Sequence, residues 1–156
     1  MRRAIRVLAP LGLLLACAVA LSACQTALRG LAPFDPLAVQ RTAEIKVETE
    51  SLMRQSGERF SRHASEVDDL TKKVEAAFEV ARATPNNQFV AQQWAIMKDP
   101  EGGLYGGFMK RWREGGTIGD AFREEKTAQI ARGFDLILCL ENAKRQPIQC
   151  DTGGGQ

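Results

Sequence analysis

Residues 60–81, with the sequence FSRHASEVDDLTKKVEAAFEVA, decide the fold class of this chain. The apolar or small side chains of the stretch recur at alternating steps of three and four, with His63 filling one position among Phe60, Val67, Leu70, Val74, Ala77 and Ala81. Residues at this spacing lie on one face of an α-helix, and a heptad of this kind is typical of the seam of a helical hairpin or a coiled coil.

The helical pattern extends from this stretch toward the N-terminus. Asp35 and Pro36 predict a helix start, because an Asp side chain can cap free backbone amides and Pro fits the first helical position. A single helix over residues 37–83 would be about 70 Å long at 1.5 Å per residue. The rest of the chain could not cover such a rod. We therefore expect either a break near Ser56 and Gly57, or a projecting helix that finds a partner through its exposed seam.

Three shorter helices are predicted after a turn at residues 84–87. Their apolar side chains recur at helical spacing around Phe89–Met97, around Leu104–Trp112 and over residues 119–144. No segment alternates apolar and polar residues as a half-buried strand does. We therefore expect one all-α domain at residues 35–150, a small helical bundle with a long N-terminal helix or helical hairpin. Residues 151–156 are expected to form a disordered tail.

The composition fits one modest domain. The chain has 156 residues, of which 44% are hydrophobic and 26% charged, and this is enough apolar material for one core but not two. Three of its 21 basic residues fall in the first 23 positions, which hold no acid, so 18 basic and 19 acidic residues follow. We therefore expect no nucleic-acid partner. One His and no Cys-x-x-Cys pair exclude the common structural zinc modules, and we expect neither a metal nor a cofactor.

The N-terminus has the pattern of a secretory signal. A basic start, MRRAIR, precedes an apolar run from Val7 to Leu21 that is too short to span a membrane comfortably. Residues 21–24, LSAC, resemble the lipobox of bacterial lipoproteins. The resemblance implies that residues 1–23 are a signal peptide, which is cut just before Cys24.

In lipoproteins of this kind the cysteine thiol is diacylated, and the new amino group is often acylated too. The resemblance therefore implies that acyl chains on Cys24 hold the protein in a membrane, and we expect residues 24–34 to form a short tether. Gln25 is not the Asp associated with retention at the inner membrane, so we expect the outer membrane, facing the periplasm. The alternatives are an ordinary signal cut after Ala20 and an uncleaved anchor.

Two cysteines would remain in the exported domain. Cys17 would leave with the signal and Cys24 would carry lipid, so Cys139 and Cys150 would form an even pair in an oxidising compartment. This predicts a disulfide between them. The alternative is that Cys139, within the apolar run at residues 136–140, is a buried core thiol and Cys150 is free.

Residues 94–119 have the most unusual composition of the chain. They hold both tryptophans, the only tyrosine and seven of the 14 glycines. Aromatic side chains on a glycine-rich frame can line a groove for a sugar, a peptide or a partner helix. The alternative is that the aromatics fill the core while the glycines make turns. The candidate partner-binding residues are Trp94, Tyr105, Phe108, Arg111 and Trp112.

His63 is the sixth candidate residue. Its charge can change near neutral pH, so it could accept a proton or sense pH. The alternative is a partly buried histidine held by hydrogen bonds. Glu66, three residues further on, is expected to pair with Arg62 rather than with His63.

The sequence thus favours a non-catalytic envelope protein that binds a protein partner or associates with itself. The basis is the apolar stripe on the long helix, together with the aromatic segment. The alternative function is a cell-wall-directed enzyme or enzyme regulator, with an aromatic groove at residues 94–112 and Glu101 at its edge.

Overall fold

The computed structural model describes residues 30–146 and 148–150. Within these ranges the chain is all-α, with five α-helices, one short 3-10 helix and no strand. The predicted fold class is confirmed. The expected signal peptide, the lipidated Cys24 and the tail at 151–156 lie outside the described residues and stay predictions.

Each α-helix is between 11 and 24 residues long. In chain order the elements are α2 (Pro36–Arg54), the 3-10 helix η1 (Phe60–Arg62), α3 (Ala64–Ala83), α4 (Gln88–Lys98), α5 (Tyr105–Gly115) and α6 (Asp120–Ala143).

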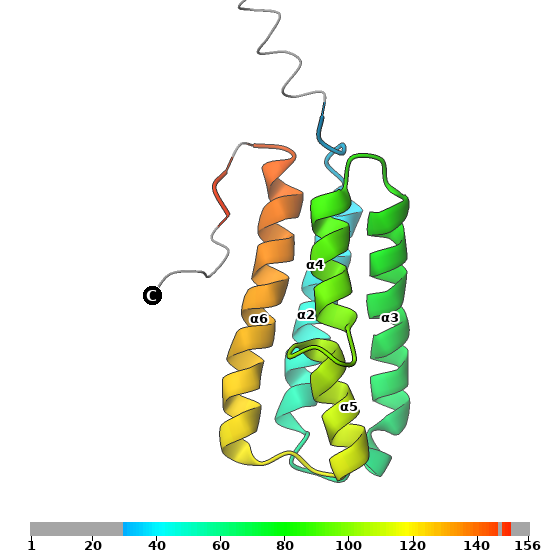
Figure 1. Cartoon of the computed structure of the whole chain (residues 1–156), viewed down its shortest axis with the longest axis vertical. Helices are drawn as coiled ribbons and strands as arrows, with labels where there is room; N and C mark the ends of the chain where they lie inside the picture. The colour runs from blue at the N-terminus through cyan, green and yellow to red at the C-terminus, as the bar shows by residue number, and fades with distance from the viewer. Residues whose placement is uncertain (1–29, 147, 151–156) are drawn as a thin grey trace, which may run out of the picture. The chain divides into compact units, whose positions relative to one another are not determined.

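Helices α2, α3, α4 and α6 form a four-helix bundle (Figure 1). Helix α2 contacts α3 and α6, and α4 contacts the same two helices. Consecutive helices run in opposite directions, except that α5 continues along the direction of α4, as Figure 1 shows. This arrangement gathers four helix ends at one end of the bundle: the beginnings of α2 and α4 and the ends of α3 and α6.

Helix α2 begins where the sequence predicts. Asp35 is the N-cap, its Oδ1 accepts a hydrogen bond of 2.9 Å from the amide of Leu37, and Pro36 occupies the first helical position. Helix α5 ends at a glycine at the other end of the bundle. Gly116 caps α5 with φ +77°, a left-handed conformation that glycine adopts without strain.

Residues 36–83 form a helical hairpin. Helix α2 ends at Arg54, and the connection to α3 is held by the segment that precedes α6. The amide of Ile118 donates to the carbonyl of Ser56 at 2.8 Å, and the amide of Phe60 donates to the carbonyl of Gly116 at the same distance. The break expected near Ser56 is therefore fixed by tertiary hydrogen bonds.

The apolar stripe of α3 is covered by the chain's own helices. Val67, Leu70, Val74 and Ala81 are all buried, and α3 packs against both α2 and α4. The expectation of an exposed seam is therefore wrong. The heptad belongs to an intramolecular bundle, in which the partner helices of the stripe are α2 and α4.

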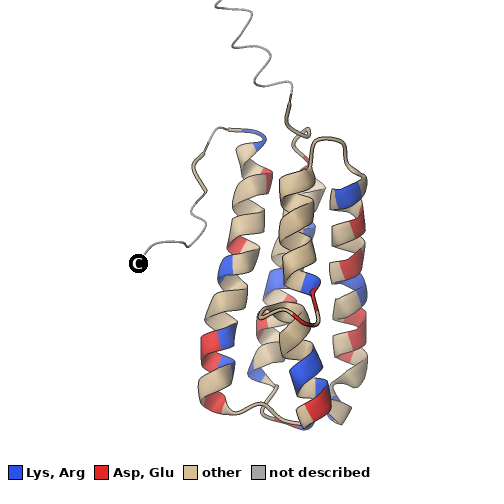
Figure 2. Ribbon diagram, viewed as in Figure 1, with Lys and Arg blue, Asp and Glu red and all other residues tan. Residues whose placement is uncertain are grey.

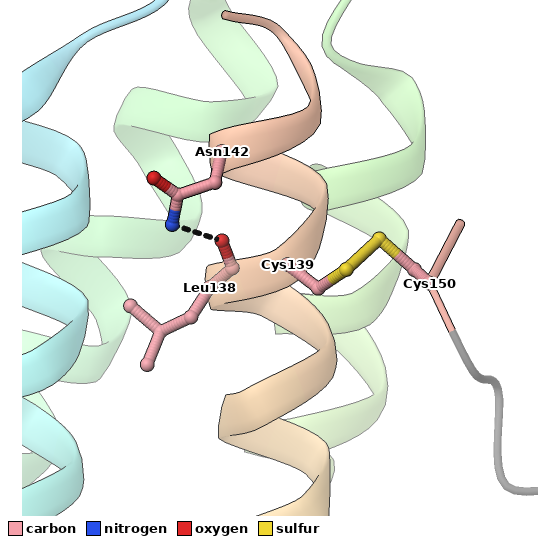
Figure 3. The surroundings of a disulfide bond; sticks show 4 residues. All are labelled: Leu138, Cys139, Asn142 and Cys150. Atoms are coloured by element: carbon pink, nitrogen blue, oxygen red, sulfur yellow. Dashed lines mark hydrogen bonds between the residues drawn. A yellow bond between two sulfur atoms is a disulfide. The ribbon is translucent and has the colours of Figure 1, made fainter. Parts of the chain in front are cut away.

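A disulfide joins Cys139 and Cys150, as predicted (Figure 3). The two residues are 11 apart in sequence. In the chain-entropy model a cross-link that closes a loop of this length stabilises the folded state by about 3 kcal/mol, because it lowers the entropy of the unfolded chain. Figure 3 shows the bond on the outside of α6, where it joins Cys150 to the helix. The alternative of a buried core thiol at Cys139 is excluded.

The bundle has a core of its own. Residues 32–156 cluster as one compact unit, and every residue of the hydrophobic core lies within it. A segment with its own core can fold by itself. The segment 32–156 is therefore the form of the protein used in the experiments below.

Candidate functional site

A cavity of about 670 Å³ lies between α2 and α3 in the half of the bundle that contains the start of α2. Its size falls within the range of small-molecule binding sites, roughly 300–1,000 Å³. Side chains of four helices line it, and the core of a helical bundle is a common place for such sites. We therefore take this cavity as the candidate functional site.

Small side chains create the space. Ala38 on α2 and Ala76, Ala77 and Ala81 on α3 line the cavity, so the facing surfaces of the two helices carry methyl groups where longer side chains would meet. Further along, Lys73 of α3 bonds both carboxylate oxygens of Glu48 on α2 at 2.6 Å. Both residues line the cavity, and their ion pair bridges α2 and α3 at its far end.

The lining is mostly apolar. Ile45 of α2 and Trp94 of α4 are buried and face the cavity from the bundle core. Val80, at its edge on α3, is half exposed. An apolar molecule that replaced water on these walls would gain the usual free energy of apolar burial, about 25 cal/mol per Å².

One buried ion pair also lines the cavity. Lys144 Nζ donates to Glu141 Oε2 at 2.6 Å, and the two side chains are only 7% and 3% exposed. Taking two charges out of water is costly, and a pair of apolar side chains is often at least as stable. The position of Lys144 next to the end of α6 offsets part of this cost, since a cation is favoured at a helix C-terminus.

The remaining acids of the lining are engaged within the protein. Asp35 caps α2, Glu44 accepts a hydrogen bond of 2.8 Å from Gln40, and Glu48 pairs with Lys73. In total four acids and three bases line the cavity, so their charges nearly balance. The site thus has no strong net charge that would select a highly charged ligand.

The predicted aromatic residues lie mainly in the core. Trp94, Tyr105, Phe108 and Trp112 are all buried, and they pack from different helices and toward different neighbours. Trp94 meets Phe134 edge to face, and Phe108 stacks on Phe122. The expectation that these aromatic side chains present a surface for a partner is not met, because their rings are the packing material between the helices.

Tyr105 and Trp112 each use their polar group inside the fold. The hydroxyl of Tyr105 lies 2.9 Å from that of Thr71, and burial raises the pKa of Tyr105 to about 12. Trp112 Nε1 donates to the carbonyl of Glu58 at 3.0 Å. A buried Tyr or Trp usually finds a hydrogen-bond partner in this way.

His63 has the structural role that was the alternative to a proton acceptor. It is buried before α3, its ring packs against Trp112, and Nδ1 lies 2.8 Å from Glu66 Oε2. The expected pairing of Glu66 with Arg62 is wrong. Arg62 instead bonds Glu58 at 3.2 Å, and this bond, with the contact from His63, lowers the pKa of the Glu58 carboxyl.

Arg111 is the one predicted site residue at the surface. Its guanidinium lies 4.2 Å from the ring centre of Phe122 and borders a second, smaller cavity of about 290 Å³. Phe108 also lines that cavity, whereas Trp94, Tyr105 and Trp112 do not. The candidate residues are therefore spread over separate places.

Glu101, the residue considered for an enzymatic role, is exposed at the edge of the smaller cavity. Its carboxylate accepts a hydrogen bond of 2.6 Å from Lys110, and its amide donates to Asp99 Oδ1 at 2.9 Å. These are the contacts of a turn built from Asp, Pro and Gly. The aromatic groove expected beside it at residues 94–112 is largely absent, because most of its aromatic side chains are packed in the core.

The sequence patterns did not predict the main cavity, although one feature of the sequence points to it. Glu141 continues the apolar stripe of α6, which contains Ile130, Phe134 and Ile137, at a spacing of four. An acid on the core face of a helix is unusual, because a buried charge needs a partner. Lys144, three residues further on, is that partner.

Comparisons with protein families, with curated proteins and with solved structures find no significant match to this chain. None of the described helices combines the length and the apolar composition needed to cross a bilayer.

Proposed function

We propose that this protein is a lipid-anchored envelope protein that acts by binding rather than by catalysis, and that the cavity between α2 and α3 is its binding site. The observation that carries the proposal is the cavity itself, a mostly apolar space of about 670 Å³ between α2 and α3 that opens to solvent beside exposed residues such as Arg41 and Lys73. Small-molecule sites are typically concave, mostly apolar spaces of this size that carry a few polar groups. The cavity between α2 and α3 has the same character, which supports a ligand site.

The anchor is proposed from the sequence. Residues 21–24 resemble a lipobox, and acylated Cys24 would hold the protein in the outer membrane with the bundle in the periplasm. The disulfide between Cys139 and Cys150 supports an oxidising compartment of this kind. The ligand is accordingly an apolar molecule of the envelope.

The lipid anchor predicts a clear result for Cys24→Ser. The full chain should incorporate radiolabelled palmitate and fractionate with membranes, whereas the variant should do neither, because the thiol that accepts the diacylglycerol is gone. Cys17→Ser serves as the matched control, since Cys17 would leave with the signal peptide. Equal labelling of the two variants would contradict the anchor.

The binding site predicts that filling the cavity abolishes binding. Ala77→Phe places a ring between α2 and α3, so the affinity of the segment 32–156 for an apolar fluorescent probe should fall by at least about tenfold. Ala128→Phe, on the exposed side of α6 and outside the lining, should leave the affinity unchanged. Probe titration measures both. An unaltered affinity in the Ala77 variant would place the probe elsewhere.

Binding of a protein partner is a second candidate function. Helix α4 exposes Phe89 by 61% and Ile96 by 46%, seven residues apart on one face. Figure 2 shows α4 without charge over most of its length, in contrast to its neighbours. Photo-crosslinking from Gln92 in intact cells tests this candidate, and one discrete protein adduct would support it.

A further inference from the structure

We propose that the ligand of this cavity is a single-chain amphiphile with an uncharged polar end that both donates and accepts hydrogen bonds, and that Glu141 and Lys144 bind this end. The inference rests on the proposed function, since it names the class of ligand for the same site. A fatty alcohol and a fatty amide belong to this class. Fatty acids and alkylamines, which carry a charge at neutral pH, do not.

The apolar chain of the ligand is accommodated by the alanine-lined space. Ala38, Ala77 and Ala81 leave room between the helices, and Ile45 and Trp94 supply the inner wall. None of these side chains has a charged group. A flexible alkyl chain can follow such a space more closely than a rigid ring can, because it adjusts its shape to the wall.

The ion pair retains capacity to bind a polar group. Lys144 has three N–H donors, and in the described residues one hydrogen bond is made by its ammonium, to Glu141 Oε2. The second carboxylate oxygen of Glu141 has no such bond from the described residues. A hydroxyl or a primary amide that reaches the pair can therefore accept from Lys144 and donate to Glu141 at the same time.

The charge of the pair determines which ligands are favoured. Glu141 and Lys144 neutralise each other, so an uncharged polar end adds no net charge to a buried site. A carboxylate would be attracted by Lys144 but repelled by Glu141, and an ammonium would meet the reverse. At the pair, neither charged end would find an unopposed counter-charge. Arg41, the third base of the lining, is exposed, so water weakens its attraction for a carboxylate.

Isothermal titration calorimetry with three ligands of equal chain length tests the preference for an uncharged polar end. Decanol, decanoate and decylammonium are titrated into the segment 32–156 at neutral pH, below the solubility of decanol and below the micelle concentrations of the two charged ligands. Decanol should bind at least about tenfold more tightly than either charged ligand. The order of the three affinities should change when either residue of the ion pair is replaced. Glu141→Gln should favour decanoate, because Lys144 is left unopposed, and Lys144→Met should favour decylammonium.

Arg145→Met is the matched control for charge. It removes one positive charge at the next residue, which is exposed and outside the lining, so the order of the three ligands should stay as in the parent protein. Urea unfolding checks that each variant is folded. If a single variant does not fold, the double variant Glu141→Leu with Lys144→Met keeps the test, because apolar replacement of a buried pair is usually tolerated. Its affinity for decanol should fall by at least about tenfold relative to the parent protein, because the groups that bind the polar end are gone.

The outcomes separate the ligand class from the function. If all three ligands bind and their order is the same in every variant, the pair does not bind the polar end and the ligand class is overturned, while the cavity still stands as a site. If no ligand binds and the apolar probe is also unaffected by Ala77→Phe, the proposed function itself is overturned.

Discussion

Replacing Trp112 with alanine should lower the free energy of unfolding by about 4 kcal/mol, near the middle of the range for buried large aromatics. Trp112 is 0% exposed. Its ring meets Phe60 edge to face at 5.6 Å and packs beside His63. The substitution removes these contacts and leaves the carbonyl of Glu58 without the indole N–H that it accepts from at 3.0 Å. Urea unfolding of the segment 32–156 measures the change.

The control for Trp112 is an aromatic residue at the surface. Phe89→Ala should change the free energy of unfolding by less than about 0.5 kcal/mol, because this ring is 61% exposed. Similar small changes in both variants would mean that Trp112 is not a core residue.

Gly107→Ala should lower the free energy of unfolding by about 3 kcal/mol, the upper end of the usual cost of overpacking. Gly107 lies in the first turn of α5, where the preceding loop crosses closely. A Cβ at this position would overlap the carbonyl oxygen of Gly102. Because the obstacle is backbone, it cannot move aside as a flexible side chain would. Thermal and urea unfolding should both show the loss.

Gly115→Ala is the matched control, since Gly115 lies at the other end of the same helix. A Cβ there would meet nothing within 4 Å, and alanine is favoured over glycine in a helix by up to about 1 kcal/mol. We therefore expect unchanged or slightly higher stability. If Gly107→Ala were as harmless as Gly115→Ala, the close approach of the loop to α5 would be refuted.

The sequence predicted those features of the fold that depend on local chemistry. Asp35 caps α2, and the two cysteines of the domain are bonded. Each depends on a side chain or backbone preference that acts within a few residues or, for the cysteines, on the compartment. Such features need no knowledge of how the helices pack.

The sequence could not show which surface covers the apolar stripe of α3. A heptad is equally satisfied by another chain and by helices of the same chain. The break after Arg54 depends on hydrogen bonds from Gly116 and Ile118, which lie about 60 residues away in sequence. The glycines of the aromatic segment were misleading for a similar reason. Gly107 is required by a close backbone contact rather than by a flexible groove.

The candidate site was only partly visible in the sequence. Trp94 was singled out for its residue type and does line the cavity, although it does so from the core. Ala77 and Ala81 of α3 belong to the predicted stripe, but a stripe does not show where two helices leave a space between them. That space depends on the separation of α2 and α3, which tertiary packing sets.

The most direct test of the central claim is to locate a bound ligand by NMR. Alanine methyl groups of the segment 32–156 are labelled with ¹³C and the protein is titrated with decanol. Binding in the cavity should shift the methyl signals of Ala38, Ala76, Ala77 and Ala81, which line it, and leave those of Ala64 and Ala121 unchanged, since these lie at the other end of the bundle. Shifts confined to Ala64 and Ala121, or no shifts at all, would contradict a binding site between α2 and α3.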